Sequence, residues 1–172
     1  MATSEPARPV PQRRVRVLVV DDSVVIRRLV TTALSEDSAI EVVGVAANGV
    51  IALAKVPQVN PDVITLDIEM PEMDGITFLK HLRKDYPHIR VIMFSTLTTR
   101  GASATIDALV MGADDYVTKA SNEGSLDASM VALRQQLVPK VKQFLKTAPP
   151  PKAAPQTAHG HQPATGSTQT AA

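Results

Sequence analysis

Residues 63–67 read VITLD and are followed at residues 69–75 by the turn-forming sequence EMPEMDG. The stretch is typical of a buried strand that ends in an aspartate. Three other short β-branched runs end in a polar side chain in the same way. The polar residues at these ends are Asp21 and Asp22 after 17–20, Asp67 after 63–66, Ser95 after 91–94 and Lys119 after 115–118. Parallel strands place their carboxyl ends along one edge of a sheet, so we expect these side chains to gather there.

Short strands and amphipathic helices alternate through the middle of the chain. We expect strands near residues 15–20, 41–46, 62–67, 90–94 and 114–117, and helices near 23–36, 49–58, 75–86 and 101–111, with a last helix from about 124. Strict alternation predicts right-handed βαβ units and a parallel sheet covered on both faces. Ser23 can cap the first helix. Pro139 removes a hydrogen bond from the last helix, so we expect a kink or a split there.

The composition predicts one folded region with two polar flanks. Of the 172 residues, we expect 1–13 to be a disordered N-terminal arm, 14–146 the folded domain, and 147–172 a disordered linker or tail rich in Pro, Ala, Thr and Gln. The chain has no cysteine, which excludes disulfides and thiol catalysis. No apolar run is long enough to cross a membrane, and the net charge of +1 gives no reason to expect nucleic-acid binding. We therefore expect a cytoplasmic protein without membrane insertion.

The polar residues at the strand ends suit phosphoryl chemistry. Crowded carboxylates repel one another, and a divalent cation such as Mg²⁺ or Mn²⁺ relieves that repulsion. A carboxylate oxygen can attack phosphorus to form an acyl phosphate, while a lysine and the metal neutralise the transferring group. Taken singly, Asp67 could be a turn former, Asp21 and Asp22 helix caps, and Lys119 a solvated surface residue. Their joint placement at the strand ends favours a phosphate-accepting, metal-dependent switch.

Four stretches of the sequence carry a resemblance to a known family. They are VLVVDDSVVIRRL, PDVITLDIEMPEMDG, VIMFSTLT and GADDYVTK. Across about residues 14–138 the chain resembles the receiver domain of two-component response regulators. The resemblance implies a doubly wound, flavodoxin-like α/β fold, with a five-stranded parallel sheet in the order 2-1-3-4-5.

The same resemblance implies a role for each polar residue at the strand ends. It implies that Asp67 is the phosphoacceptor and that Asp22, Asp67 and the backbone carbonyl of Glu69 bind Mg²⁺, with Asp21 helping through a metal-bound water. Ser95 stands at the family's switch hydroxyl position, Tyr116 at its switch aromatic position and Lys119 at its characteristic lysine position. A sensor histidine kinase of the chemotaxis type is the implied phosphodonor. The implied output is a domain in cis or a target protein bound through the face formed by helix 101–111, strand 114–117 and the last helix.

More particularly, the motifs look like those in the regulatory halves of chemotaxis receptor methylesterases, the protein-glutamate methylesterase/glutamine deamidases. In that family a linker and a catalytic domain follow the receiver. This sequence contains no G-x-S-x-G nucleophile motif. We therefore expect a regulatory fragment whose only chemistry is self-phosphorylation from small donors and autodephosphorylation. Methylesterase activity is expected only if the chain continues into a catalytic domain.

One departure from the family pattern and three other functions remain open. Receivers usually have proline after the lysine, but Ala120 follows Lys119 here, so we expect a trans peptide and a rearranged or more mobile loop. A stand-alone receiver could act as a phosphate sink or a diffusible signal. An aspartyl-phosphate phosphohydrolase would also use a strand-end aspartate, although it requires D-x-D after its first strand. A DNA-binding regulator that has lost its output domain is the third alternative.

Overall fold

The computed structural model describes residues 13–96, 99–119 and 126–146. Strands and helices alternate along these residues, as the sequence predicts. The elements are β1 (Val15–Val20), α1 (Val24–Ser35), β2 (Ile40–Ala46), α2 (Gly49–Val59), β3 (Val63–Asp67), α3 (Gly75–Asp85), β4 (Arg90–Ser95), α4 (Thr99–Val110), β5 (Asp115–Thr118), α5 (Leu126–Lys142) and the 3-10 helix η1 (Gln143–Lys146). None of the described helices is both long enough and apolar enough to cross a membrane.

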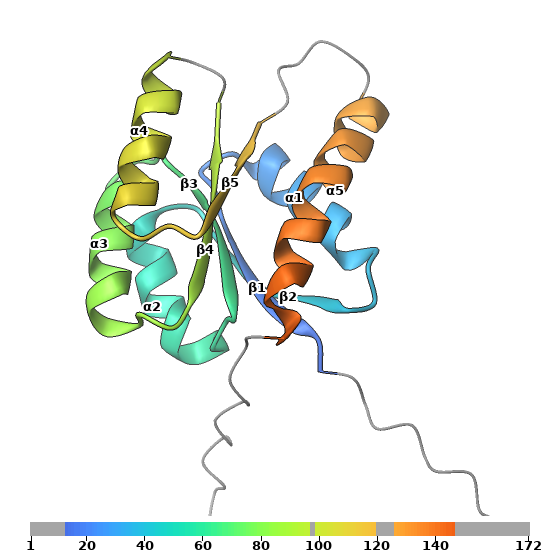
Figure 1. Ribbon diagram of the computed structural model, residues 1–172, viewed down its shortest axis with the longest axis horizontal. Coiled ribbons are helices and arrows are strands. Elements are labelled where there is room, and N and C mark those ends of the chain that lie inside the picture. Colours follow the sequence, from blue (N-terminus) through green and yellow to red (C-terminus); the bar gives the residue numbers. More distant parts are fainter. Residues whose placement is uncertain (1–12, 97–98, 120–125, 147–172) are drawn as a thin grey trace, which may run out of the picture.

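The five strands form one parallel sheet in the order β2-β1-β3-β4-β5, which confirms the predicted topology. Helices α1 and α5 cover one face, and α2, α3 and α4 cover the other (Figure 1). Each face has its own apolar core, because side chains alternate between the two faces along every strand. Central strands are therefore apolar on both sides, and all five residues of β3 are buried.

The three helices that follow β1, β2 and β3 each begin at a polar N-cap residue. Ser23, Asn48 and Asp74 are the N-caps of α1, α2 and α3, and each accepts a hydrogen bond from the backbone three residues ahead. Gly75 follows its cap at a point where the chain crosses β3 closely. A Cβ atom there would lie 2.1 Å from the carbonyl oxygen of Asp67, so no larger residue fits. This contact holds the loop after Asp67 against the strand end.

The last helix excludes one of the two outcomes predicted at Pro139, the split. Helix α5 runs from Leu126 to Lys142 with Pro139 inside it, so Pro139 does not split the helix. A proline at this position removes one hydrogen bond, to the carbonyl of Gln135. Gln135 and Pro139 are both exposed, so water can bond that carbonyl. The helix changes to 3-10 geometry only at Gln143.

Ion pairs fix the ends of the described domain. At the start, Arg13 donates to Asp62 at 2.6 Å. At the other end, Lys142 of α5 pairs with Asp37, in the loop between α1 and β2, at 3.0 Å. The predictions for residues 1–12 and 147–172, and for the peptide between Lys119 and Ala120, concern residues outside the described ranges.

Candidate functional site

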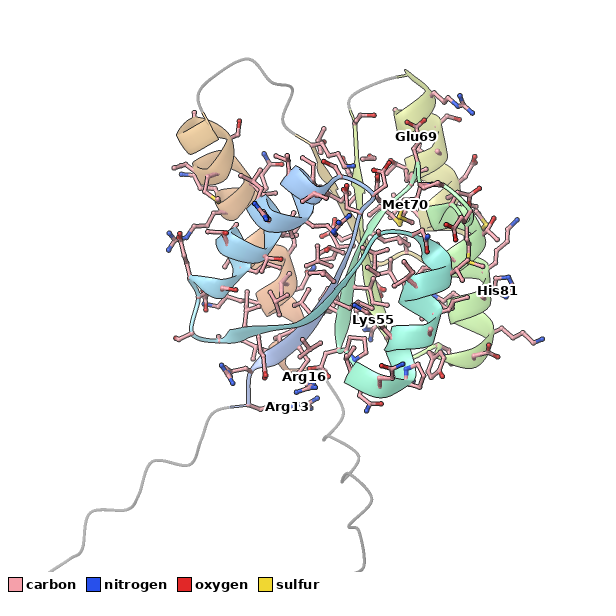
Figure 2. The ribbon with its side chains drawn as sticks, turned by 180° about the vertical axis from the view of Figure 1, so that it is seen from behind. Arg13, Arg16, Lys55, Glu69, Met70 and His81 are labelled. Atoms are coloured by element: carbon pink, nitrogen blue, oxygen red, sulfur yellow. The ribbon has the colours of Figure 1, made fainter. Side chains whose placement is uncertain are left out.

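The polar residues at the carboxyl ends of the strands surround one cavity. Its volume is about 230 Å³, and its lining residues are Asp22, Asp67, Ile68, Glu69, Ser95, Thr96, Gly101 and Lys119. Figure 2 shows Glu69 and Met70 at this end of the molecule, far from Arg13 and Arg16 at the opposite end of the sheet. The placement matches the rule that open α/β sheets bind ligands outside the carboxyl ends of their strands.

Lys119 joins two of the predicted carboxylates. Its Nζ atom lies 2.9 Å from Asp67 Oδ1 and 2.8 Å from Asp21 Oδ2, and all three side chains are largely buried. Burial opposes the lysine charge, but the Asp21 and Asp67 carboxylates outweigh it and raise the pKa of Lys119. The ammonium group also lies 5.5 Å from the centre of the Phe94 ring. Lys119 is therefore held as a cation beside Asp67.

The surroundings of Asp67 strongly raise the pKa of its carboxyl group. Burial raises the pKa of its carboxyl to about 6, although the hydrogen bond from Lys119 lowers it, and the charge of Asp21 adds to the rise. Asp67 Oδ1 accepts a hydrogen bond from the backbone N–H of Ile68 at 2.8 Å. Its Oδ2 atom has no hydrogen bond to any described residue. The second oxygen of a carboxylate that lines the cavity is thus free to bind a ligand.

The carboxylates of Asp21, Asp22 and Asp67 form a cluster suited to a hard cation. One oxygen from each lies within 4.8 Å of the others. Mg²⁺ binds octahedrally with oxygens at about 2.1 Å, which puts ligand oxygens roughly 3–4 Å apart, so small side-chain shifts suffice. Asp21 Oδ2 is buried and touches Lys119, but it has no aligned hydrogen bond within the described part of the chain. A buried carboxylate oxygen in this state still has the capacity to bind a hydrated Mg²⁺ ion.

The side chain of Ser95 contacts helix α4. Its Oγ lies 2.7 Å from Thr105 Oγ1, and Thr105 in turn donates to the carbonyl of Gly101 at 2.7 Å. Ser95 and Thr105 are each only 6% exposed. No sequence signal selects Thr105, because its role depends on how α4 packs against β4.

Tyr116 lies on β5 and does not line the cavity. Its side chain is 48% exposed, and Lys140 Nζ lies 5.6 Å from the centre of its ring. Asp115 connects the two residues, because its Oδ1 accepts from Lys140 at 2.6 Å and from the Tyr116 backbone N–H at 2.7 Å. The side chain therefore faces outward, held against the last turns of α5.

Most of the residues selected from the sequence come together in space. The cavity is lined by five of them, Asp22, Asp67, Glu69, Ser95 and Lys119. Asp21 is not among the lining residues but contacts one of them, Lys119. Three further lining residues, Ile68, Thr96 and Gly101, were not selected. They carry no charge, and their positions follow from loop geometry rather than from a sequence signal. The roles of all these residues stay predictions.

Comparisons with known proteins agree with this fold. A family profile described as the response regulator receiver domain matches residues 17–131. The chain is 57% identical over 129 residues to a protein-glutamate methylesterase/protein-glutamine glutaminase of Trichodesmium erythraeum, a match that covers 75% of this chain and 37% of the relative. A protein of the same description from a Nocardioides species is 56% identical over 131 residues, covering 76% of this chain and 36% of the relative.

Solved structures give the same result. The response regulator domain of Thermotoga maritima CheB superposes with a TM-score of 0.70 at 42% identity, covering 80% of this chain and all of that one. CheY from Borrelia burgdorferi, solved as a CheX–CheY–BeF3–Mg²⁺ complex, gives a TM-score of 0.58 at 30% identity, covering 72% and 89% of the two chains.

The fold and the acidic edge define a flavodoxin-like α/β signalling domain. The chain belongs to the response regulator receiver domain family. It spans 37% of the length of the first methylesterase it matches, and the match corresponds to the receiver portion.

Proposed function

We propose that the chain accepts a phosphoryl group on Asp67 with Mg²⁺ bound, and that this modification switches a protein-binding surface. The supporting observation is the meeting of Asp67, Lys119 and the other acidic residues around one cavity at the carboxyl edge of the sheet. Phosphoryl transfer depends mainly on positioning and on neutralising charge, and these residues supply both.

Asp67 Oδ2 is the proposed nucleophile, because it lacks a hydrogen bond to any described residue while Oδ1 is bonded by Ile68 and Lys119. As a bond forms between this oxygen and phosphorus, the phosphorus–nitrogen bond of a phosphohistidine breaks and its electron pair stays on that nitrogen. The second ring nitrogen of the phosphohistidine already carries a proton, so the departing imidazole is neutral. With a small acyl phosphate, the phosphorus–oxygen bond breaks and a carboxylate leaves. Lys119 contacts a phosphoryl oxygen and offsets its charge.

Asp21, Asp22, Asp67 and the backbone carbonyl of Glu69 would hold the magnesium ion, with Asp21 acting through a bound water. The ion would supply positive charge to the phosphoryl oxygens. The cluster of three carboxylates supports this assignment. The beryllofluoride and Mg²⁺ in the complex of the related Borrelia CheY support it by analogy, since beryllofluoride has the shape and charge of a phosphoryl group.

Ser95 and Tyr116 are the proposed switch residues. Ser95 moves towards the phosphoryl group, and Tyr116 turns inward to fill the space that is vacated. The output surface would be the α4–β5–α5 face, where Ile106, Val110, Tyr116 and Val131 are exposed. A sensor histidine kinase of the chemotaxis type would supply the phosphoryl group, and the cytoplasm, where such donors are made, is the proposed compartment.

The relatives support a more particular role. Their names are those of protein-glutamate methylesterases, and the chain matches about a third of their length. We propose that the described domain is the regulatory part of such an enzyme, joined to its output domain by residues 147–172. In this arrangement the receiver, when unphosphorylated, restrains methylesterase activity. A stand-alone receiver that sequesters phosphate or binds a target protein is the alternative function.

Intact-mass measurement after incubation with acetyl phosphate and Mg²⁺ tests the primary proposal. The wild-type protein should gain the mass of one phosphoryl group, and omission of Mg²⁺ should prevent the gain. The Asp67→Asn variant should gain nothing. Equal modification of the variant, or none of the wild type, contradicts the proposal. Catalytic turnover of small phosphate monoesters would instead favour a phosphohydrolase.

A further inference from the structure

A chain of two hydroxyl groups connects the end of β4 to the first turns of α4. Ser95 Oγ and Thr105 Oγ1 are 2.7 Å apart, and Thr105 Oγ1 is 2.7 Å from the carbonyl oxygen of Gly101. Ser95 and Gly101 line the cavity, while Thr105 lies behind them. Both residues are more than nine-tenths buried. Their hydrogen-bond partners in the resting protein are each other and the backbone carbonyl of Gly101.

The direction of these hydrogen bonds follows from counting protons. A carbonyl oxygen can only accept, so the single hydroxyl proton of Thr105 points to Gly101. Thr105 then has only lone pairs to offer, and the Ser95 hydroxyl must donate to it. The one proton of Ser95 is therefore directed at Thr105 in α4.

Phosphorylation of Asp67 would create a competing acceptor. Phosphoryl oxygens are strong hydrogen-bond acceptors and carry negative charge, so a hydrogen bond to one of them is stronger than a bond between two neutral hydroxyls. Ser95 has a single proton and cannot donate to Thr105 and to a phosphoryl oxygen at once. The two interactions exclude each other.

We propose that Thr105 is a positioning residue that holds Ser95 in the resting state and releases it on phosphorylation. The proposal rests on the proposed function of Asp67 and adds a residue through which α4 responds. On release, Thr105 keeps its own bond to Gly101, so only its acceptor site loses a partner. Because Gly101 and Thr105 lie on consecutive turns of α4, the exchange acts directly on a helix of the proposed output face.

The Thr105→Val variant isolates this role. Valine has nearly the shape of threonine but cannot accept a hydrogen bond, so the variant weakens the resting position of Ser95 and leaves its bond to a phosphoryl group intact. The resting state is then disfavoured, and the affinity for beryllofluoride in the presence of Mg²⁺ should increase about threefold to fivefold. The Thr105→Ser variant keeps the hydroxyl and is the matched control. Its affinity should equal that of the wild type.

A double-mutant cycle with Ser95→Ala separates this role from simple support of the helix. In the resting protein, urea unfolding of the four proteins should give a coupling between positions 95 and 105 of about threefold to fivefold in the unfolding equilibrium constant. With saturating beryllofluoride and Mg²⁺, the coupling should disappear. In the Ser95→Ala background, Thr105→Val should leave the beryllofluoride affinity, measured by calorimetry, unchanged.

Each outcome bears on the proposal. An unchanged or weaker beryllofluoride affinity in Thr105→Val, an equal effect in the Ser95→Ala background, or a coupling that persists with beryllofluoride overturns it. A wild-type protein that binds no beryllofluoride overturns the proposed function together with the exchange. The resting cycle distinguishes these cases, because it detects the Ser95–Thr105 hydrogen bond without any ligand.

Discussion

Replacing Asp67 with asparagine should stabilise the metal-free protein at neutral pH. Burial raises the pKa of Asp67 to about 6, whereas an aspartate in an unfolded chain has a pKa of about 3.9. The folded state thus binds the proton more tightly. The stabilisation from this group is complete below about pH 4 and is lost as the pH rises through about 6.

The size of the effect follows from the two pKa values. A difference of about two pKa units means that ionisation of Asp67 lowers the free energy of unfolding by roughly 2–3 kcal/mol near neutral pH. The asparagine side chain would keep an oxygen for the Ile68 N–H but would carry no charge. Lys119 would retain Asp21 at 2.8 Å and would not be left unpaired. Between about pH 4.5 and 7.5, the advantage of the variant should therefore grow by about 2 kcal/mol.

Urea unfolding at several pH values in the presence of EDTA measures this effect. The matched control is Asp37→Asn, because hydrogen bonds from Ala39 and Lys142 lower the pKa of Asp37. Loss of that carboxylate should destabilise the protein near neutral pH and matter less in acid, the opposite dependence. If the Asp67→Asn variant is no more stable than the wild type near neutral pH, or gains equally at every pH, burial does not strain this carboxyl and the reasoning fails.

Substitutions at three further positions test other parts of the structure. Glu72 has a φ of 66°, so Glu72→Gly should raise the unfolding free energy by about 0.5–1 kcal/mol, while Glu72→Ala should give no gain. Thr65 Oγ1 is buried without a hydrogen-bond partner, and Thr65→Val should stabilise by about 1 kcal/mol in thermal unfolding. Lys119→Met leaves Asp21 and Asp67 without their cation, so it should destabilise the protein by about 2–3 kcal/mol near neutral pH in EDTA. Added Mg²⁺ should restore part of that loss, and an unchanged stability would contradict the predicted charge balance.

The fold could be predicted because each strand and helix follows from local signals. Strand β3 is apolar on both faces and ends at a charged residue, and Asp74 begins the next helix as a cap. Of the kink or split predicted at Pro139, the split does not occur, because helix propensity does not record where a helix faces water. An exposed carbonyl at Gln135 can bond to water, so the proline does not break α5.

Site residues at the ends of strands could be predicted, because the sheet itself sets their positions. Residues whose positions depend on how a helix packs against the sheet could not. Asp67 and Lys119 follow strands, and parallel strands bring their ends together whatever the helices do. Thr105 lies in the middle of α4, and its contact with Ser95 depends on how that helix rotates against β4. The outward position of Tyr116 depends similarly on Lys140, which is 24 residues further along the chain.

The destabilising carboxylate at Asp67 and the hydrogen-bond exchange proposed at Ser95 have different roles in the same site. In the resting protein Asp67 is a buried carboxylate with a raised pKa, next to a second carboxylate, and a single lysine offsets both. Any ligand that adds positive charge at this edge is therefore bound with the energy of relieving that repulsion. Ser95, by contrast, already donates its one hydroxyl proton to Thr105 at rest and gains only when a stronger acceptor appears. The acidic cluster thus favours the binding of metal, while the hydroxyl chain responds to the phosphoryl group itself. We therefore expect Mg²⁺ alone to bind without moving α4. Helix α4 should move only when Mg²⁺ and a phosphoryl analogue are both present, and the amide chemical shifts of α4 measure the difference.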